Sequence, residues 1–388
     1  KGTRMRFIHT SDLHIGKTVS GFSMLEEQEA ALKQIMDYVK ERQADAVLLS
    51  GDLYDRSVPP AAAVTMFDAF LTGLSEMGVT ILAIAGNHDC GERIGFANRI
   101  LEKRGLYLEG KLEAPVRFVD IPDQWGFVRV HLAPFAKPAE VRSLYRCEGS
   151  MKTFEESFEE ILRHVTYSPG GRDILMAHQF VVNQGLLPEL SDSETRVSVG
   201  GTDQVEAALF QPFCYTALGH IHGCQQIGKN PVYYSGSPVK YSFSECSHRK
   251  SVLYGEVGEN GKVTLERLPL TPVHDMRKIR GRLADLILPE VVSAADPEDY
   301  ILAVLTDETE LLDPIGTLRS VYPNIMQLKW EKRAVEQDDT VIHDDIMKEK
   351  GPYGLFADFY ELVTGKTMSE EQEAVMRETA EQAEEEVS

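Results

Sequence analysis

The sequence has few cysteines, no long apolar run and no internal repeat, and these absences exclude several classes of protein. Its five cysteines form no C-x-x-C pair, so a reducing compartment fits better than a disulfide framework. No apolar stretch reaches the roughly 18 residues that a membrane-spanning helix requires, and no positively charged leader precedes an apolar segment. We therefore expect a soluble, cytoplasmic protein without membrane contact.

Basic residues are also scarce, with 40 Lys and Arg against 61 Asp and Glu and a net charge of −21. Taken alone, this balance argues against a free-standing nucleic-acid-binding protein, because phosphate neutralisation requires clustered Lys and Arg. The excess is uneven, since residues 331–388 hold 17 acidic and 6 basic residues and so supply 11 of the 21 surplus charges. Carboxylates gathered around metal ions would also count in this sum without presenting a negative surface.

The first and largest part of the chain reads as a layered α/β domain over residues 5–270. Short apolar strands alternate there with helices, which is the rhythm of βαβ units. Apolar residues at helical spacing predict helices over 24–42 and 59–78, which lead into strands over 46–50 and 79–85. With 388 residues, the chain is long enough for two or three domains.

Two smaller regions follow. Residues 274–332 predict a small α+β capping domain, with strands over 276–283, 300–305 and 325–331 and a helix over 313–321. Its first strand carries a basic run, which consists of Arg277, Lys278, Arg280 and Arg282. This run is either a solvated face or a surface that restricts access to a neighbouring site. Residues 337–388 predict a helical tail, with Asp338 and Asp339 as candidate N-caps.

Polar residues gather where five apolar strands of the α/β domain stop. They are Asp12 and His14 in SDLHIGK, Asp52 and Asp55 in SGDLYD, Asn87, His88 and Asp89 in GNHD, His178 in MAHQF, and His220 and His222 in LGHIHG. Each cluster alone has a structural explanation, such as a helix cap, a turn or a core histidine. Because the carboxyl ends of strands in open α/β sheets form the ligand crevice, five such clusters favour one shared site.

The residue types indicate a metal site. Asp, Asn and His supply oxygen and imidazole ligands, which suit manganese, iron or zinc better than calcium. Two metals about 4 Å apart need a shared ligand, and a carboxylate with two oxygens can bridge them. Glycines at 51, 86 and 219 would let the backbone turn sharply after each strand.

The order D-x-H, G-D-x-x-D, G-N-H-D, lone His and G-H-x-H resembles the calcineurin-like metallophosphoesterase superfamily. The segments TSDLHIGK, GDLYDRSVPP and YYSGSPVKYSFSE (233–245) are similar to one branch of it, the SbcD family of nuclease subunits of bacterial SbcCD complexes. The metal motifs specify little beyond the superfamily, whereas the segment 233–245 is far more specific. With the capping domain and the tail, the resemblance covers essentially the whole chain.

The resemblance implies a site with two divalent metal ions, most simply Mn²⁺, with Fe or Zn as alternatives. The implied ligands are Asp12, His14 and His222 for one ion, Asn87, His178 and His220 for the other, and Asp52 as the bridge. His88 would face the leaving oxygen as a proton donor or transition-state stabiliser, and Asp55 would orient it. Arg56 would contact phosphate, although a solvated surface arginine is an equal alternative.

The resemblance further implies a DNA nuclease with exonuclease activity on duplex ends and endonuclease activity on single strands or hairpins. It would be a homodimer within a heterotetramer that contains an SbcC-like ATPase, and would act in DNA end processing, repair and recombination. A small-molecule or cyclic-nucleotide phosphodiesterase is the alternative, and the negative charge mildly favours it. A non-catalytic scaffold would lack some ligands, and none of the seven is missing.

The tail predicts an apolar helical stripe over 352–364, PYGLFADFYELVT, which ends at Gly365. Ser369 and Gln372 form a candidate capping box for a second helix. On periodicity alone, the stripe packs either on the protein's own core or on a partner. The resemblance favours docking of the 337–388 tail on the ATPase.

Overall fold

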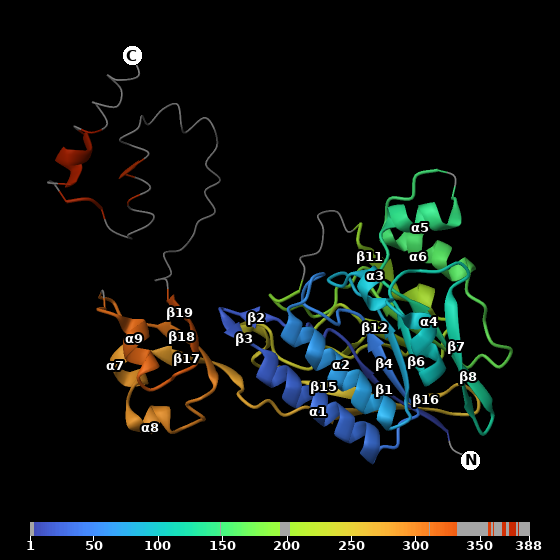
Figure 1. Ribbon diagram of the computed structural model, residues 1–388. Helices are drawn as coiled ribbons and strands as arrows, with labels where there is room; N and C mark the ends of the chain where they lie inside the picture. Colours follow the sequence, from blue (N-terminus) through green and yellow to red (C-terminus); the bar gives the residue numbers. More distant parts are fainter. Residues whose placement is uncertain are drawn as a thin grey trace. The chain divides into compact units, whose positions relative to one another are not determined.

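The computed structural model describes residues 4–147, 149–194, 202–309 and 311–331, and within the C-terminal part residues 356–357, 360, 367–369, 372–377 and 379. The chain forms two compact units, residues 1–329 and residues 330–388. The first unit contains two six-stranded sheets and one three-stranded sheet, and Figure 1 labels many of their strands.

The first six-stranded sheet is parallel in its centre and antiparallel at one edge. Its strand order is β16 (Val263–Pro269), β15 (Ser251–Val257), β1 (Met5–Thr10), β4 (Ala46–Ser50), β5 (Thr80–Ile84) and β6 (Leu106–Glu109). Helices α1 (Leu25–Glu41) and α2 (Ala61–Glu76) run side by side over its outer face in Figure 1. Their apolar stripes pack on this face, with Ile35 and Phe70 almost fully buried.

The second six-stranded sheet has the order β13 (Gln225–Gln226), β14 (Val232–Tyr234), β12 (Tyr215–Gly219), β9 (Asp173–His178), β8 (Gly126–Ala133) and β7 (Arg117–Asp123). Helices α5 (Pro138–Tyr145) and α6 (Phe154–Arg163) contribute Val141 and Phe158 to the core on its outer face. Each six-stranded sheet therefore carries helices on one face.

The inner faces of the two sheets pack against each other. Alternate residues of the first sheet, such as Phe7 and Leu48, share one buried cluster with Val130, Met176 and Ala217 of the second sheet. This arrangement gives a helix–sheet–sheet–helix sandwich. The strands β1, β4, β5, β9 and β12 are buried along almost their whole length, which explains their continuous apolar sequences.

Short elements complete the sandwich. They are β2 (Thr18–Val19), β3 (Phe22–Ser23), α3 (Gly91–Ile94), α4 (Asn98–Leu101), η1 (Glu102–Arg104), β10 (Phe180–Val182), β11 (Gln204–Glu206), η2 (Ala207–Phe210) and η3 (Phe243–Glu245).

The three-stranded sheet belongs to the region predicted as a capping domain. Its order is β17 (Met276–Gly281), β18 (Tyr300–Leu305) and β19 (Ile325–Trp330), and the helices of this region are α7 (Leu283–Leu286), α8 (Pro289–Val292) and α9 (Pro314–Arg319). One face buries Leu318 and Tyr322 in a core of its own. The other places Met276 and Tyr300 in a cluster with Met24 of the sandwich.

The predicted elements correspond closely to the observed ones. The helices predicted over 24–42 and 59–78 are α1 and α2, and the strands predicted over 46–50 and 79–85 are β4 and β5. The domain boundaries at 270–274 and 332–337 stay predictions. Within the residues that the structure describes, no helix is long and apolar enough to cross a membrane.

The predicted capping box of the tail is present. The Ser369 amide donates to Gln372 Oε1 at 2.9 Å, and the Gln372 amide donates to Ser369 Oγ at 3.3 Å. Of the predicted stripe over 352–364, the structure describes only Phe356, Ala357 and Tyr360, all of them helical. Asp338, Asp339 and Gly365 lie outside the described residues.

Candidate metal centre

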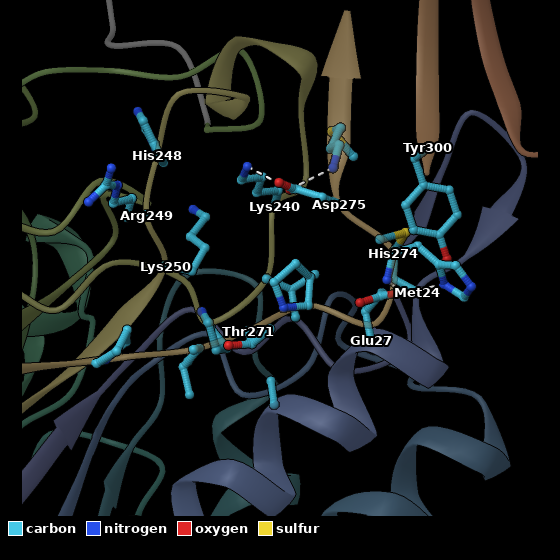
Figure 2. A pocket seen from close by; sticks show the side chains of 17 residues that line it. Met24, Glu27, Lys240, His248, Arg249, Lys250, Thr271, His274, Asp275 and Tyr300 are labelled. Carbon is cyan, nitrogen blue, oxygen red and sulfur yellow. Dashed lines mark hydrogen bonds and ion pairs between the residues drawn. The ribbon is translucent and has the colours of Figure 1, made fainter. Parts of the chain in front are cut away.

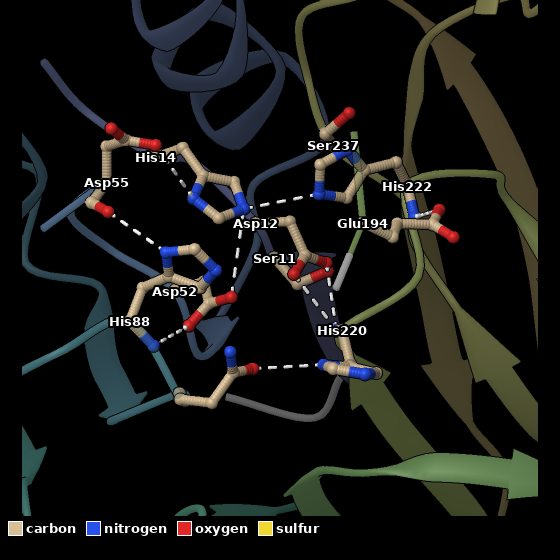
Figure 3. A network of polar contacts seen from close by, with 12 residues as sticks. Ser11, Asp12, His14, Asp52, Asp55, His88, Glu194, His220, His222 and Ser237 are labelled. Carbon is tan, nitrogen blue, oxygen red and sulfur yellow. Dashed lines mark hydrogen bonds and ion pairs between the residues drawn. The ribbon is translucent and has the colours of Figure 1, made fainter. Parts of the chain in front are cut away.

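All seven predicted ligands lie at the carboxyl ends of five strands. Figure 3 shows how the side chains of Asp12, His14, Asp52, His220 and His222 converge. The first sheet contributes Asp12 and His14 after β1, Asp52 after β4 and Asn87 after β5. The second sheet contributes His178 at the end of β9 and His220 and His222 after β12. The sandwich therefore brings together residues that are far apart in the sequence.

One group of ligand atoms comes from Asp12, His14 and His222, which lie within 4.8 Å of one another and are buried. The Nε2 atoms of His14 and His222 face each other at 3.2 Å. Two imidazole nitrogens at this separation require a proton or a cation between them, because two lone pairs would repel. This group corresponds to the first predicted metal position.

Asn87 is the centre of a second group. Its Oδ1 atom lies 3.0 Å from Nε2 of His178 and 3.0 Å from Nδ1 of His220. The other nitrogen of His178, Nδ1, lies 2.9 Å from the main-chain oxygen of Ser50. Nδ1 therefore carries the proton and donates it to Ser50, which leaves Nε2 available as a ligand.

Asp52 lies between the two groups. Its Oδ2 atom is 3.3 Å from Nε2 of His178 and 3.7 Å from Nε2 of His14. Its other oxygen, Oδ1, accepts a hydrogen bond from the main-chain amide of His88 at 2.9 Å. This is the position that a bridging carboxylate requires.

The loops that carry these ligands adopt unusual backbone conformations. Asp12, His14 and Asp52 have φ angles of 53°, 42° and 49°, in the left-handed region that favours glycine. The loops hold each other in place, since the Asp12 amide donates to Gly51 O at 3.0 Å and the His14 amide donates to Asp52 O at 2.9 Å. Such conformations at polar residues are typical of functional sites.

Two of the predicted glycines are required for close packing around the ligands. A Cβ atom at Gly51 would collide with the His178 ring, and Gly51 also has a φ of 91°. A Cβ atom at Gly86 would lie 2.8 Å from Cγ of Asp52 and closer still to its Oδ1. The absence of side chains therefore lets the ligands approach one another.

The electrostatics of the site favour a cation. Burial raises the pKa of the Asp12 carboxyl to about 7. Burial also opposes ionisation of Asp52, but the neighbouring His178 keeps its pKa well below the usual value. Burial works to lower the pKa of His178, and the Asp52 carboxylate raises it to about 9. With imidazole, carboxylate and amide donors around this buried negative charge, the residues fit divalent ions such as Mn²⁺, Fe²⁺ or Zn²⁺.

His88 lies at the edge of the cluster, with its ring 4.8 Å from that of His14, edge to face. Its Nδ1 atom is 3.0 Å from the main-chain oxygen of Asp55. The Asp55 carboxylate instead lies 2.7 Å from Lys17 Nζ. Asp55 therefore contacts His88 through its main-chain oxygen and not through its carboxylate. Arg56 lies 3.7 Å from Asp55, and its side chain is 74% exposed.

Several residues support the ligand loops without having been predicted as ligands or catalytic residues. Gln28 donates to the His14 carbonyl oxygen at 2.7 Å and to the Tyr241 hydroxyl at 2.9 Å. Tyr241 in turn donates to the carbonyl oxygen of Leu13. Asp89 accepts hydrogen bonds from Leu53, Tyr54 and Gly86 and so joins the loops after β4 and β5. Only Asp89, in GNHD, and Tyr241, within 233–245, had a signal in the sequence.

A separate cavity of about 210 Å³ lies between α1 and the connection to the three-stranded sheet. Figure 2 shows Glu27, Lys240, Lys250, Asp275 and Tyr300 around it. None of the seven predicted metal ligands lines this cavity.

Comparison with known proteins agrees with this geometry. Residues 5–224 match the calcineurin-like phosphoesterase family, and residues 272–364 match a domain described as the type 5 capsule protein repressor C-terminal domain. Because the first match covers more than half of the chain, the protein belongs to the calcineurin-like phosphoesterase family. The predicted fold class and the prediction of a metal-dependent phosphoesterase are confirmed.

Two curated proteins are similar over nearly the full length. The SbcD component of nuclease SbcCD from Staphylococcus epidermidis is 29% identical over 371 residues, which cover 95% of this chain and 96% of that protein. The protein of the same name from Staphylococcus saprophyticus is 29% identical over 372 residues, with the same shares covered. A crystal structure of a protein from Thermus thermophilus is 15% identical and has a TM-score of 0.40, covering 68% of this chain and 99% of its own.

Proposed function

We propose that this protein is a manganese-dependent DNA nuclease that cleaves duplex ends as an exonuclease and single strands or hairpins as an endonuclease. The observation that carries the proposal is the extent of similarity to the two nuclease components, which runs over 95% of the chain. The phosphoesterase match ends at residue 224, so the similarity includes the regions that a small substrate would not require. Its place would be DNA end processing, repair and recombination.

The ligand groups define how the site would hold its ions. Asp12, His14 and His222 would hold one ion, and Asn87, His178 and His220 the other, with Asp52 shared between them. When bound, the two ions would activate the attacking water and offset charge on the phosphate oxygens. The buried, preorganised ligands keep these positions fixed before the substrate arrives.

His88 would act on the leaving group. Its Nδ1–H donates to the Asp55 carbonyl oxygen at 3.0 Å, and this contact orients the ring. The other nitrogen, Nε2, is then the atom that would give a proton to the leaving oxygen. Arg56, which is exposed and beside Asp55, would contact a neighbouring phosphate.

The 337–388 tail would dock an SbcC-like ATPase, and the complex would contain two copies of each chain. The domain match over 272–364 supports a distinct role for the C-terminal region. Residues 331–388 hold 17 acidic and 6 basic residues, so a partner would supply the cationic surface for DNA. Truncation after residue 336 should leave metal-dependent cleavage of small substrates intact and abolish co-purification with the ATPase. Retained binding by the truncated protein would refute the docking role.

The basic run of β17 would contribute to DNA selection only in part. Arg277 donates to the Asp299 carboxylate at 2.8 Å and to the Asp296 carbonyl oxygen at 2.9 Å, so its guanidinium is engaged within the domain. Lys278 is exposed and better placed to meet a phosphate. Lys278→Glu should therefore shift the balance between duplex and single-strand cleavage more than Arg277→Gln does.

The competing function is a small-molecule or cyclic-nucleotide phosphodiesterase with the same metal site. The test is metal analysis of the purified protein together with digestion of a labelled hairpin DNA, a labelled duplex and a chromogenic phosphodiester. We expect two metal ions per chain and Mn²⁺-dependent cleavage of both DNA substrates. A clear preference for the small ester would replace the nuclease proposal with the phosphodiesterase.

A further inference from the structure

A buried ion pair lies behind His222, outside the five strand-end motifs. Glu245 ends the short helix η3 and is fully buried, and Lys250 precedes β15 and is 7% exposed. Buried Glu and Lys side chains are rare, because taking each charge out of water is costly unless it is paired. Neither residue has a role in the proposed chemistry so far.

The Lys250 ammonium group is fully engaged inside the protein. Its three donors have three acceptors, which are Glu245 Oε2 at 2.6 Å, Ser237 Oγ at 2.8 Å and the His222 carbonyl oxygen at 3.0 Å. Its side chain also lines the cavity of Figure 2. The close contact with Lys250 keeps Glu245 in its ionised form, in which the carboxylate can only accept hydrogen bonds.

Ser193 joins Glu245 to His222. The Ser193 hydroxyl forms a hydrogen bond with Oε1 of Glu245 and lies 2.7 Å from Nδ1 of His222. Because the carboxylate can only accept, Ser193 must donate its single proton to Glu245. The hydroxyl oxygen can then only accept from His222, so Nδ1 of His222 carries a proton and Nε2 keeps its lone pair.

That lone pair is directed toward the first metal position. Nε2 of His222 faces Nε2 of His14 and belongs to the group that contains Asp12. A neutral imidazole coordinates a metal through the nitrogen that lacks a proton. We infer that Glu245, paired with Lys250, is a positioning residue that fixes the tautomer of His222 through Ser193 and thereby sets the affinity of the Asp12, His14 and His222 position. The inference rests on the proposed metal site.

The second metal position should not depend on this pair. The tautomer of His178 is set by the main-chain oxygen of Ser50 at 2.9 Å, which no side-chain substitution removes. Loss of Glu245 should therefore weaken one of two metal sites and leave the other unchanged. A general loss of folding would weaken both.

Glu245→Gln provides the sharpest variant. The amide oxygen would turn toward the Lys250 ammonium, and the amide N–H₂ would turn toward Ser193. With Ser191 Oγ, 2.7 Å from Ser193 Oγ, as the donor of that pair, Ser193 would then donate to His222 Nδ1. This reverses the relay and places the proton on Nε2, where it blocks coordination. The double variant Glu245→Met with Lys250→Met removes both charges together, which is far better tolerated than leaving one charge unpaired.

The experiment titrates the chelator-treated full-length protein with Mn²⁺ and measures free Mn²⁺ by electron paramagnetic resonance. For the native sequence we expect two sites. For Glu245→Gln we expect one site weakened by about 10- to 100-fold, the usual effect of losing a partner of a metal-ligating histidine, and the other unchanged. Cleavage should recover at saturating Mn²⁺, because the change acts on metal affinity rather than on the chemical step.

Asp173→Asn is the matched control. Asp173 is also a buried carboxylate bound to a serine and a histidine, with Ser168 Oγ at 2.6 Å and His131 Nε2 at 2.8 Å. It lies at the start of β9, at the opposite end of that strand from His178. This variant should lose stability but keep both Mn²⁺ affinities.

The outcomes separate the two proposals. If the native protein binds two ions and the variants with changed Glu245 bind them equally well, the positioning role is wrong and the proposed function stands. If Glu245→Gln does not fold, the Mn²⁺ titration of the double variant decides. One site with weakened affinity is the expected result, and two sites with unchanged affinity would contradict the inference. If the native protein binds no Mn²⁺, the manganese-dependent function fails and the inference fails with it.

Discussion

The Nδ1 atom of His88 lies 3.0 Å from the main-chain carbonyl oxygen of Asp55, whereas the Asp55 carboxylate points to Lys17 at 2.7 Å. A main-chain acceptor persists when the side chain changes. Asp55→Asn should therefore reduce turnover far less than the ~100-fold that loss of a general acid causes. Steady-state cleavage of a chromogenic phosphodiester measures this. A loss as large as that of a His88 variant would show that the carboxylate itself is required.

His88→Gln should separate catalysis from metal binding. We expect turnover to fall by roughly 100-fold or more, because the leaving oxygen loses its proton donor. Both metals should remain bound, since His88 is not among the predicted ligands. Asp52→Asn is the contrasting variant and should lose metal. Elemental analysis of both proteins decides, and metal loss in His88→Gln would contradict the division between ligand and acid.

Gly86→Ala should disturb the bridging carboxylate. The new Cβ atom would lie 2.8 Å from Cγ of Asp52, so either the loop or the ligand must move. Overpacking of this kind costs about 1–3 kcal/mol. We expect a lower free energy of unfolding and weaker metal binding. Gly170→Ala is the control, because among the described residues no atom outside its two chain neighbours lies within 4 Å of its Cβ position. Equal behaviour of the two variants would show that the loop adapts without cost.

His9 should make the metal-free protein sensitive to acid. Burial lowers its pKa to about 3, while its ring is held by Tyr215 and Leu218 at 2.9 and 3.2 Å. Between about pH 6.5 and 3, the unfolded chain therefore binds a proton that the folded chain does not, and stability falls as the pH falls. From pH 7.5 to 5, this histidine should remove about 2 kcal/mol.

The measurement is urea unfolding of the native protein and of His9→Gln at both pH values, with metal removed by a chelator. The variant should lose about 2 kcal/mol less than the native protein over this interval. Equal losses would show that His9 accepts a proton in the folded state.

The sequence predicted the convergence of the candidate ligands better than it predicted the residues that support them. The ligands follow strand ends within short motifs, so their convergence follows from the rules of α/β sheets. The role of Glu245 could not be predicted in this way, because its relay passes through Ser193, 52 positions earlier in the chain. Only the folded chain brings these two side chains together.

Contacts made by main-chain atoms could not be predicted from the sequence either. The carbonyl oxygens of Ser50 and Asp55 orient His178 and His88, and a carbonyl leaves no trace in a residue pattern. The short helix α5 and the strands β10 and β11 were also not predicted, because strands of 3 residues and a helix of 8 residues carry too little periodicity.

The sandwich has a thermodynamic consequence for the metal centre. Asp12, His14, Asp52 and Asn87 follow strands of the first sheet, whereas His178, His220 and His222 belong to the second. Ions bound by both sets would act as cross-links between the two sheets. The affinity for metal and the free energy of packing the two sheets together would therefore be thermodynamically coupled. A large-to-small substitution in the core between the sheets, such as Met176→Ala, leaves a cavity there and would then weaken ion binding at a distance. Conversely, saturating metal would restore part of the folding stability that Met176→Ala removes.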